Sequence, residues 1–291
     1  MRTFISLMQR EWWENQSAFM RVPAIVGMIL VLAAILAFIA YGIGVHINAI
    51  DTSQFNQQAS SVVIHMLFYM SGIPFIFVLW LLIASYSLSC LYDDRRDKSI
   101  LFWNSLPISQ TETVLSKVVT ALIVAPICTL ICMIITQLIL LIVGTIILLI
   151  IGLNFWTVFW HPGVIISTWF SQLAALCEQM LWLLPWFAWF MLCSAYAKKA
   201  PFIRAIVPII IILLIELFFS QHHYFAHFAF GNIAHAMGAW KVGDVYNKQA
   251  MLVESQIPFT LAKNYIYMYI GWLVSAICII GAIATRFRTE T

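Results

Sequence analysis

Polar and ionisable side chains inside long apolar runs are the residues of this sequence whose types could do chemistry. Glu178 lies in one such run with Gln172 about two helical turns earlier, and Glu216 lies near the end of the next run. A carboxylate in apolar surroundings is costly unless it is protonated, paired or in contact with water. Glu178, Gln172 and Glu216 are therefore candidates for a translocation path. Bonds between helices are the alternative for Glu178 and Gln172, and Glu216 also fits the outer membrane interface.

Metal binding and catalysis are not expected. Cys128 and Cys132, and likewise His223 and His227, are four residues apart and would share a helix face, but neither pair has a clearly placed third ligand. The sequence lacks a His-Glu-x-x-His motif, a nucleophile motif and paired carboxylates at a useful spacing. It also lacks the Gly-x-x-x-x-Gly-Lys-Ser/Thr phosphate loop, so we expect no ATP hydrolysis by that mechanism. We predict no catalytic residue, no metal and no cofactor bound by this chain.

The elements that must position these side chains are membrane-spanning helices. Of the 291 residues, 63% are hydrophobic and 9% are charged, whereas about a quarter of a soluble domain is charged. A water-soluble fold of this composition would expose large apolar patches, so most of the surface must contact lipid. Spans of about 20 apolar residues are then expected. Six runs qualify: Val22–Val45, Ile64–Leu91, Val114–Leu153, Ile165–Tyr196, Phe202–Phe219 and Tyr265–Thr285.

The third run is long for a single span. At ~1.5 Å per residue it would measure about 60 Å as a helix, twice the hydrocarbon thickness. We predict one helix, bent at Pro126 and projecting beyond the bilayer. The alternative is a hairpin of two helices, but Gly144-Thr145 is a poor turn to bury in lipid.

The basic residues give the orientation. With six spans, twelve of the fifteen Lys and Arg residues fall on the side of the two chain ends, and only Lys241, Lys248 and Lys263 fall on the other. The positive-inside rule then predicts that both ends are cytoplasmic. Splitting the third run would destroy this asymmetry. The predicted fold is therefore an all-α integral membrane protein with six transmembrane helices, in a single domain over residues 1–291.

Three segments outside the spans have compositions that each predict a particular position or partner. Residues 1–21 fit an amphipathic interfacial helix with Trp12 and Trp13 at headgroup depth. Residues 92–113 form a cytoplasmic loop that is charged at its start and then too apolar for free exposure, so it needs a membrane or protein partner unless it packs on its own bundle. Residues 220–263 are rich in aromatic side chains. This composition predicts short helices that dip into the outer leaflet or cap the bundle.

The loop carries a family resemblance. Its sequence YDDRRDKSILFWNSLPIS over residues 92–109, continuing to TVLSK at 113–117, resembles the loop between the second and third helices of ABC-2 type transporter permeases. The layout is also similar to that family, with an N-terminal elbow helix, a cytoplasmic coupling helix between spans two and three, and a re-entrant outer segment before span six. Lys98 departs from the family, in which many members have Gly at this position.

The resemblance implies a membrane-spanning permease subunit of an ATP-binding-cassette transporter, commonly an exporter, in the bacterial cytoplasmic (inner) membrane. Two permease copies, as a homodimer or with a second kind of permease, would pair with two copies of a separate subunit that binds ATP and Mg. Membrane lipid is the other expected partner, and nucleic acid is not expected. The implied docking residues for the ATPase subunit are Arg10, Trp12, Asp97, Ile100, Leu101, Phe102, Trp103 and Leu106.

Two other functions use the same kind of chain. A stand-alone secondary transporter or channel is disfavoured because the halves show no repeat and the spans hold few ionisable groups to carry coupling ions. A membrane subunit that transports nothing would use the same helices and docking surfaces, so the sequence does not separate it from a permease.

Overall fold

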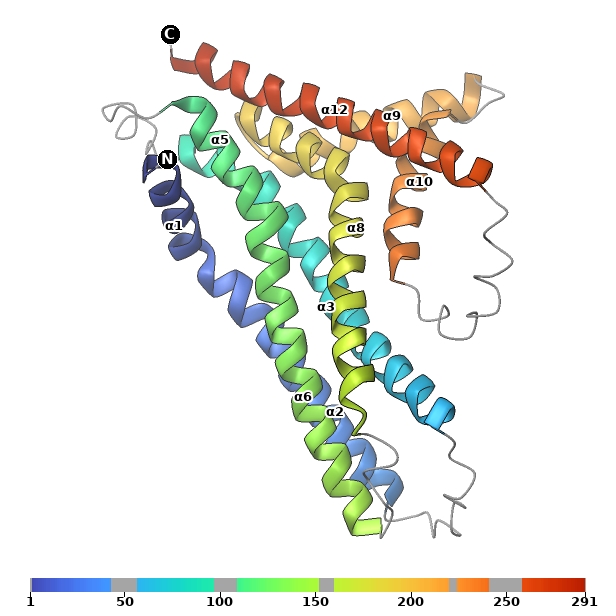
Figure 1. Cartoon of the computed structure of the whole chain (residues 1–291). Helices are drawn as coiled ribbons and strands as arrows, with labels where there is room; N and C mark the ends of the chain where they lie inside the picture. The colour runs from blue at the N-terminus through green and yellow to red at the C-terminus, as the bar shows by residue number, and fades with distance from the viewer. Residues whose placement is uncertain are drawn as a thin grey trace.

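The structure of the chain is a computed structural model, and it describes residues 2–42, 57–96, 109–151, 160–219, 224–240 and 258–290. All regular secondary structure in these ranges is helical (Figure 1). Six of the helices are long and apolar enough to cross a membrane. The predicted all-α class and the predicted number of spans are therefore confirmed for the part of the chain that the structure describes.

The helices follow one another in the order that the hydropathy predicts. The elements are α1 (Arg2–Gln16), η1 (Ser17–Arg21), α2 (Val22–Gly42), α3 (Gln57–Arg96), α5 (Gln110–Val119), η3 (Thr120–Val124), α6 (Ala125–Ile151), α8 (Pro162–Tyr196), α9 (Pro201–Phe219), α10 (Tyr224–Ala239) and α12 (Pro258–Glu290), where η denotes a π-helical turn. The first span joins α1, η1 and α2, and the third joins α5, η3 and α6.

Each π-helical turn ends two residues before a proline. η1 ends at Arg21 ahead of Pro23, and η3 ends at Val124 ahead of Pro126. A proline has no N–H to donate to the carbonyl four residues earlier, and its ring crowds that carbonyl, so the preceding turn widens. Figure 1 shows the ribbon changing direction between α1 and α2. The N-terminal segment thus bends at η1 while it stays helical, and its position at a membrane interface remains a prediction.

The third span is one continuous helix. Residues Gln110–Ile150 form a single helical stretch of 41 residues, with the π-helical turn next to Pro126. The prediction of one long helix is confirmed, and the hairpin alternative is not what the structure contains. Ser109 caps the start of α5, since its side chain accepts a hydrogen bond from the backbone N–H of Thr111 at 3.3 Å.

The core lies where α3, α6 and α8 meet. Phe75 and Leu79 of α3, Met133 of α6 and Leu183 of α8 are almost completely buried in it. The helix α8 packs most extensively against α3 and α12. On the other side of the molecule α2 packs along α6, and Gly27 lies so close to Thr136 that a side chain there would collide. Close approach at small residues is the usual way for helices to pack in lipid.

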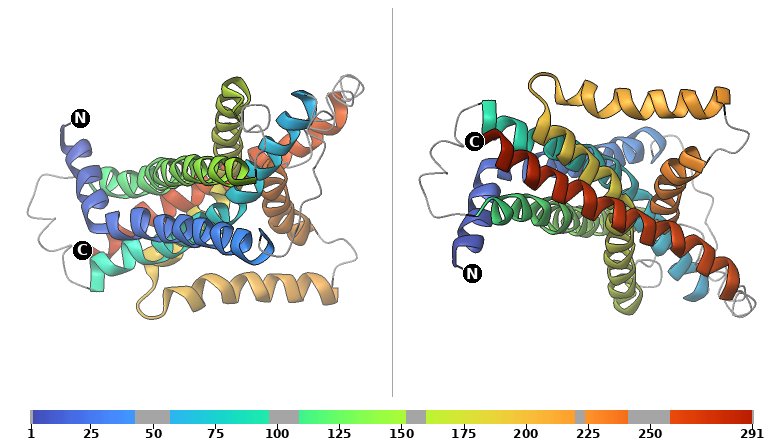
Figure 2. Two further views of the ribbon diagram at one scale, coloured as in Figure 1. Left: turned by 90° about the horizontal axis from the view of Figure 1, so that it is seen from below. Right: turned by 90° about the horizontal axis from the view of Figure 1, so that it is seen from above.

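The two chain ends lie at the same end of the molecule (Figure 1). The end of α3, the start of α5 and the end of α12 are found there too, whereas α2 and α6 end at the opposite pole (Figure 1). Seen from above and below, α9 runs along one flank and α12 crosses over α8, so the six candidate spans are not all parallel (Figure 2). The placement of both termini at one end agrees with an even number of crossings.

The segment 220–263 is described only in part. Within it, α10 packs against α8 and α9, and Trp240, just after α10, donates a hydrogen bond from its indole Nε1 to the carbonyl of Tyr69 in α3 at 3.0 Å. The last helix α12 begins at Pro258, ahead of the predicted start at Tyr265. The described part therefore packs onto the bundle, while its depth in a membrane remains a prediction.

Candidate functional site

Four charged side chains are buried together at the end of the molecule that holds both termini. We call Glu11, Asp94, Lys117 and Arg286 the ionic cluster. Their exposed fractions are 2%, 7%, 2% and 3%. They come from α1, α3, α5 and α12, so the cluster joins four helices that are far apart in the sequence.

Lys117 is the centre of the ionic cluster. Its Nζ donates a hydrogen bond to Glu11 Oε1 at 2.8 Å and lies 3.4 Å from each carboxylate oxygen of Asp94. Arg286 Nη1 donates to Asp94 Oδ2 at 3.2 Å, and Tyr86 donates its hydroxyl to Glu11 Oε2 at 2.7 Å. Two acids face two bases, so the buried charge is balanced. Such balance is what makes ionised groups tolerable away from water.

Local sequence places Lys117 on the inner face of α5. Val114 three positions before it and Ala121 four positions after it share its face of the helix, and both are buried. Leu7 is buried one turn before Glu11 on the inner face of α1. The two charges thus lie on the faces through which α1 and α5 pack together. The apolar neighbours exclude water, and this strengthens each ionic contact within the cluster.

A second set of contacts attaches α8 to the same end. The guanidinium of Arg95 donates to the backbone carbonyls of Ser194 and Ala197 at the end of α8. The hydroxyl of Ser194 in turn accepts from the backbone N–H groups of Leu91 and Tyr92. The helix α3 therefore ends in contacts that hold α1, α5, α8 and α12 around it.

Two of the predicted docking residues are described, and both contact the chain's own fold. Arg10 donates from Nε to Glu14 Oε1 at 2.7 Å, and its Nη2 lies 3.7 Å from Asp94 Oδ1, at the edge of the ionic cluster. Trp12 is partly buried against the main core. The other predicted docking residues lie outside the described residues; they are Asp97, Ile100, Leu101, Phe102, Trp103 and Leu106.

The candidate path residues do not come together. Gln172 is fully buried, and its Nε2 donates to the carbonyl of Phe68 at 3.2 Å, which is a bond between α8 and α3. Glu178 lies on the exposed surface of α8, whereas its neighbour Gln179 is fully buried. Glu216 lies on α9 and contacts the start of α10. These three residues thus occupy separate places in the protomer.

Glu216 has a clear structural contact. Its two carboxylate oxygens accept the backbone N–H groups of Phe225 at 2.6 Å and Ala226 at 2.8 Å. These N–H groups belong to the first turn of α10 and have no partner within the helix. A carboxylate at a helix N-terminus satisfies them and interacts favourably with the helix dipole. Glu216 therefore fastens the start of α10 to α9.

Replacing Glu216 by Ala is expected to loosen the first turn of α10. Loss of a capping side chain costs about 0.5–2 kcal/mol, and the cost should be confined to this region. Hydrogen–deuterium exchange of the detergent-solubilised protein should rise in residues 224–230. Glu178→Ala removes an exposed carboxylate and is the matched control, which should leave that exchange unchanged. Equal exchange in the Glu216 variant and the wild type would contradict the capping role.

Metal binding finds no support among the described residues. No group of three or more His, Cys, Asp or Glu side chains is placed to hold an ion there. His223, one half of the pair considered from the sequence, lies outside the described residues. All six cysteines are described and are free thiols, and Cys128 and Cys132 are both buried in the apolar core.

The ionic cluster and Gln179 are the features that sequence reasoning missed. Asp94 and Lys117 belong to the loop motif and Glu11 to the predicted amphipathic helix, but nothing in the sequence joins them. A weak signal existed, since Lys117 has apolar residues three positions before it and one position after it at Val114 and Val118. Gln179 gave no signal that separates it from the other polar residues of α8.

Comparison with known proteins does not add a family: no family model matches this chain, and neither a curated protein nor a solved structure matches it. The chain is thus characterised by its own residues and fold, as a helical protein with six candidate membrane spans. The resemblance of residues 92–117 to the ABC-2 type permeases stays a prediction.

Proposed function

We propose that this chain is the membrane-spanning permease subunit of an ATP-binding-cassette exporter, driven by a separate ATPase subunit. Two permease copies would work with two ATPase subunits that carry ATP and Mg. The observation that carries the proposal is the ionic cluster at the base of the loop 97–108. It supports the proposal because a loop can transmit movement from an ATPase to the spans only if the helix ends on both sides of the loop are rigidly connected.

Charged contacts connect the two helices on either side of this loop. Asp94 lies just before the loop on α3, and Lys117 lies on α5, the helix that follows it. Their contact at 3.4 Å ties the two helices together. Glu11 and Arg286 extend the connection to α1 and α12. A push on the loop would therefore move the ends of four helices as one unit.

The mechanism proposed follows from that coupling. ATP would draw the two ATPase subunits together, and the loops docked on them would follow. Because the helices joined by each loop are stiff, the permease pair would switch between inward-open and outward-open packings. The ATPase would be docked by the apolar loop residues, which include Phe102 and Trp103, with the elbow helix beside them. No route for the substrate is assigned, because the candidate path residues lie apart.

The orientation proposed has both termini in the cytoplasm of a bacterial cell, with the protein in the inner membrane. Two observations support it: most basic residues fall on the side of the chain ends, and the ends lie together in the fold (Figure 1). The ATPase, which needs cytoplasmic ATP, would meet the loop 97–108 on this side.

The test is purification of the tagged chain from its host in a mild detergent, followed by identification of co-purifying proteins. A soluble subunit with a phosphate-binding loop, present at one copy per permease, is the expected result. A chain that purifies alone under conditions that keep other transporter complexes intact would overturn the proposal. It would then favour a stand-alone transporter or channel. A stoichiometric partner without a phosphate loop would favour a membrane subunit that transports nothing.

A further inference from the structure

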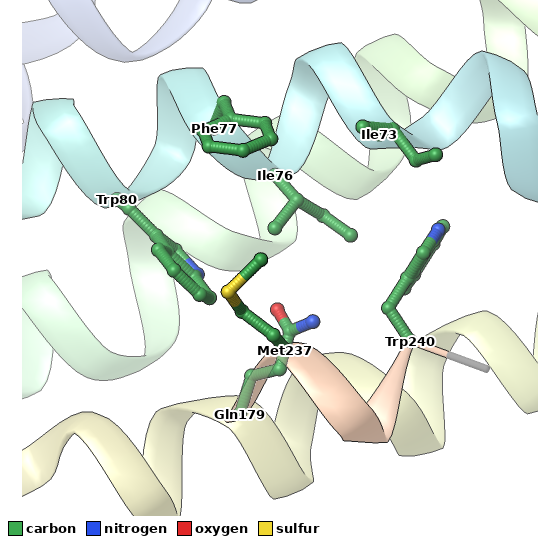
Figure 3. A pocket seen from close by; sticks show the side chains of 7 residues that line it. All are labelled: Ile73, Ile76, Phe77, Trp80, Gln179, Met237 and Trp240. Atoms are coloured by element: carbon green, nitrogen blue, oxygen red, sulfur yellow. The ribbon is translucent and has the colours of Figure 1, made fainter. Parts of the chain in front are cut away.

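A small cavity lies between α3, α8 and the end of α10. Its volume is about 170 Å³, and its lining consists of Ile73, Ile76, Phe77, Trp80, Gln179, Met237 and Trp240. All of these side chains except Gln179 are apolar or aromatic, and none is charged. Figure 3 shows the aromatic rings of Trp80 and Trp240 on either side, with Ile76 and Met237 between them.

The carboxamide of Gln179 is buried in this cavity without a partner. The side chain is fully buried, and neither its Nε2 nor its Oε1 has a hydrogen-bond partner among the residues that the structure describes. Figure 3 shows the carboxamide pointing away from α8 into the space between Ile76 and Met237. The indole Nε1 of Trp80 is likewise buried and without a partner in the described part of the chain.

An unsatisfied amide at this place is expensive. Gln179 lies near the middle of α8, and Ile76 and Trp80 lie near the middle of α3. Both helices are candidate spans, so the cavity is at membrane depth, where water is scarce. A buried polar group without a partner loses its hydrogen bonds to water and gains none in the protein, which destabilises the fold. A leucine of similar size would avoid that cost, so the glutamine is costly for the fold alone.

We infer that this cavity is a binding site for a small, uncharged, aromatic molecule that carries one hydroxyl or amide group. The volume compares with an engineered apolar cavity of about 150 Å³ that takes up benzene. The Trp80 and Trp240 rings match an aromatic body. Gln179 offers an amide NH2 group as donor and a carbonyl oxygen as acceptor, and a hydroxyl or amide on the ligand can bond to both kinds of group. No charged side chain lines the cavity, so an ionised ligand would lose its hydration without compensation.

The cavity has a mouth on the outer surface of the protomer. Phe77 is 54% exposed and Met237 is 53% exposed, whereas Gln179 and Ile76 lie deep in the wall. The mouth therefore opens on the surface of the protomer between a candidate span and α10, and a ligand that partitions into the bilayer can be tested at it directly. This inference is independent of the proposed transport function, because it concerns one protomer and needs no ATPase.

The test compares two probes of similar shape on the purified full-length chain in lipid nanodiscs. 4-Fluorophenol carries the hydroxyl and 4-fluorotoluene lacks it, and ¹⁹F NMR reports binding against empty nanodiscs. We expect saturable binding of 4-fluorophenol, weakened roughly 5- to 10-fold by Gln179→Leu, the factor that one neutral hydrogen bond supplies. Binding of 4-fluorotoluene should not weaken in that variant.

Glu178→Gln is the matched control, since it changes the neighbouring residue on the exposed surface of α8 and leaves the cavity intact. It should bind 4-fluorophenol as the wild type does. Thermal unfolding supplies a second readout: Gln179→Leu should be at least as stable as the wild type, because it removes an unsatisfied amide. Absence of saturable binding, equal binding of 4-fluorophenol by wild type and Gln179→Leu, or a clear loss of stability in that variant would each overturn the inference.

Discussion

Replacing Lys117 by Met is expected to lower the free energy of unfolding by about 3–5 kcal/mol, the usual cost of removing one partner from a buried ion pair. Without the ammonium group, Glu11 loses its ion-pair partner in the cluster, and Asp94 keeps only its contacts with Arg286 and with Arg10 at the edge of the cluster. Methionine fills a similar volume, so the loss measures charge and not packing. Unfolding in a mixed-micelle denaturant titration would give the value.

Two further variants separate the ionic cluster from a general effect of losing a lysine. Lys198→Met removes an exposed lysine in the turn after α8 and should change stability by less than ~0.5 kcal/mol. The double variant Lys117→Met with Glu11→Gln removes one acid with one base and restores the charge balance. It should be more stable than Lys117→Met alone, a non-additivity expected only for residues in contact. A double variant that loses the sum of both single effects would refute the cluster.

Replacing Phe102 and Trp103 by Asp is expected to abolish binding of the proposed ATPase subunit while the protein stays in the membrane. Phe102 and Trp103 have the largest apolar side chains in residues 97–108, and aromatic residues commonly dominate protein interfaces. Two carboxylates at those positions would have to be desolvated on binding. Co-purification of the ATPase and its stimulation by the permease are the two measurements.

The conservative pair Phe102→Leu with Trp103→Phe is the control for this prediction. It keeps the apolar character of the loop and should retain at least part of the binding. Full co-purification and transport by the Asp double variant would remove the docking role from this loop. Loss of the protein from the membrane would show that the two residues serve folding, and the docking assignment would then fail as well.

The hydropathy of the sequence was enough to predict the class and the number of spans. Lipid is a uniform apolar solvent, so a helix that crosses it must be apolar over its whole length, and such runs are visible in one dimension. The long third helix followed from the same rule, because a polar turn at Gly144 would leave backbone groups unsatisfied in lipid. The π-helical turn ahead of Pro126 is explained by the missing N–H of proline.

The rotation of each helix about its axis was decided only by the tertiary structure. A span such as α8 has apolar residues on every side and only a few polar ones, so the sequence does not indicate which face is buried. Adjacent residues on a helix point about 100° apart. The packing of α8 against α3 and α12 therefore places the Gln179 side chain in the cavity and leaves Glu178 on the surface. From the sequence, Glu178 was the candidate for a functional site.

The contacts among distant charges also required the fold. The composition and the basic-residue count predicted a membrane protein with its ends on one side, since these depend on each residue's preference for lipid or water. Whether Lys117 meets water or a carboxylate depends on which helices lie beside it. Its partners Glu11 and Asp94 lie on other helices, and only the packing of α1, α3, α5 and α12 brings them within bonding distance.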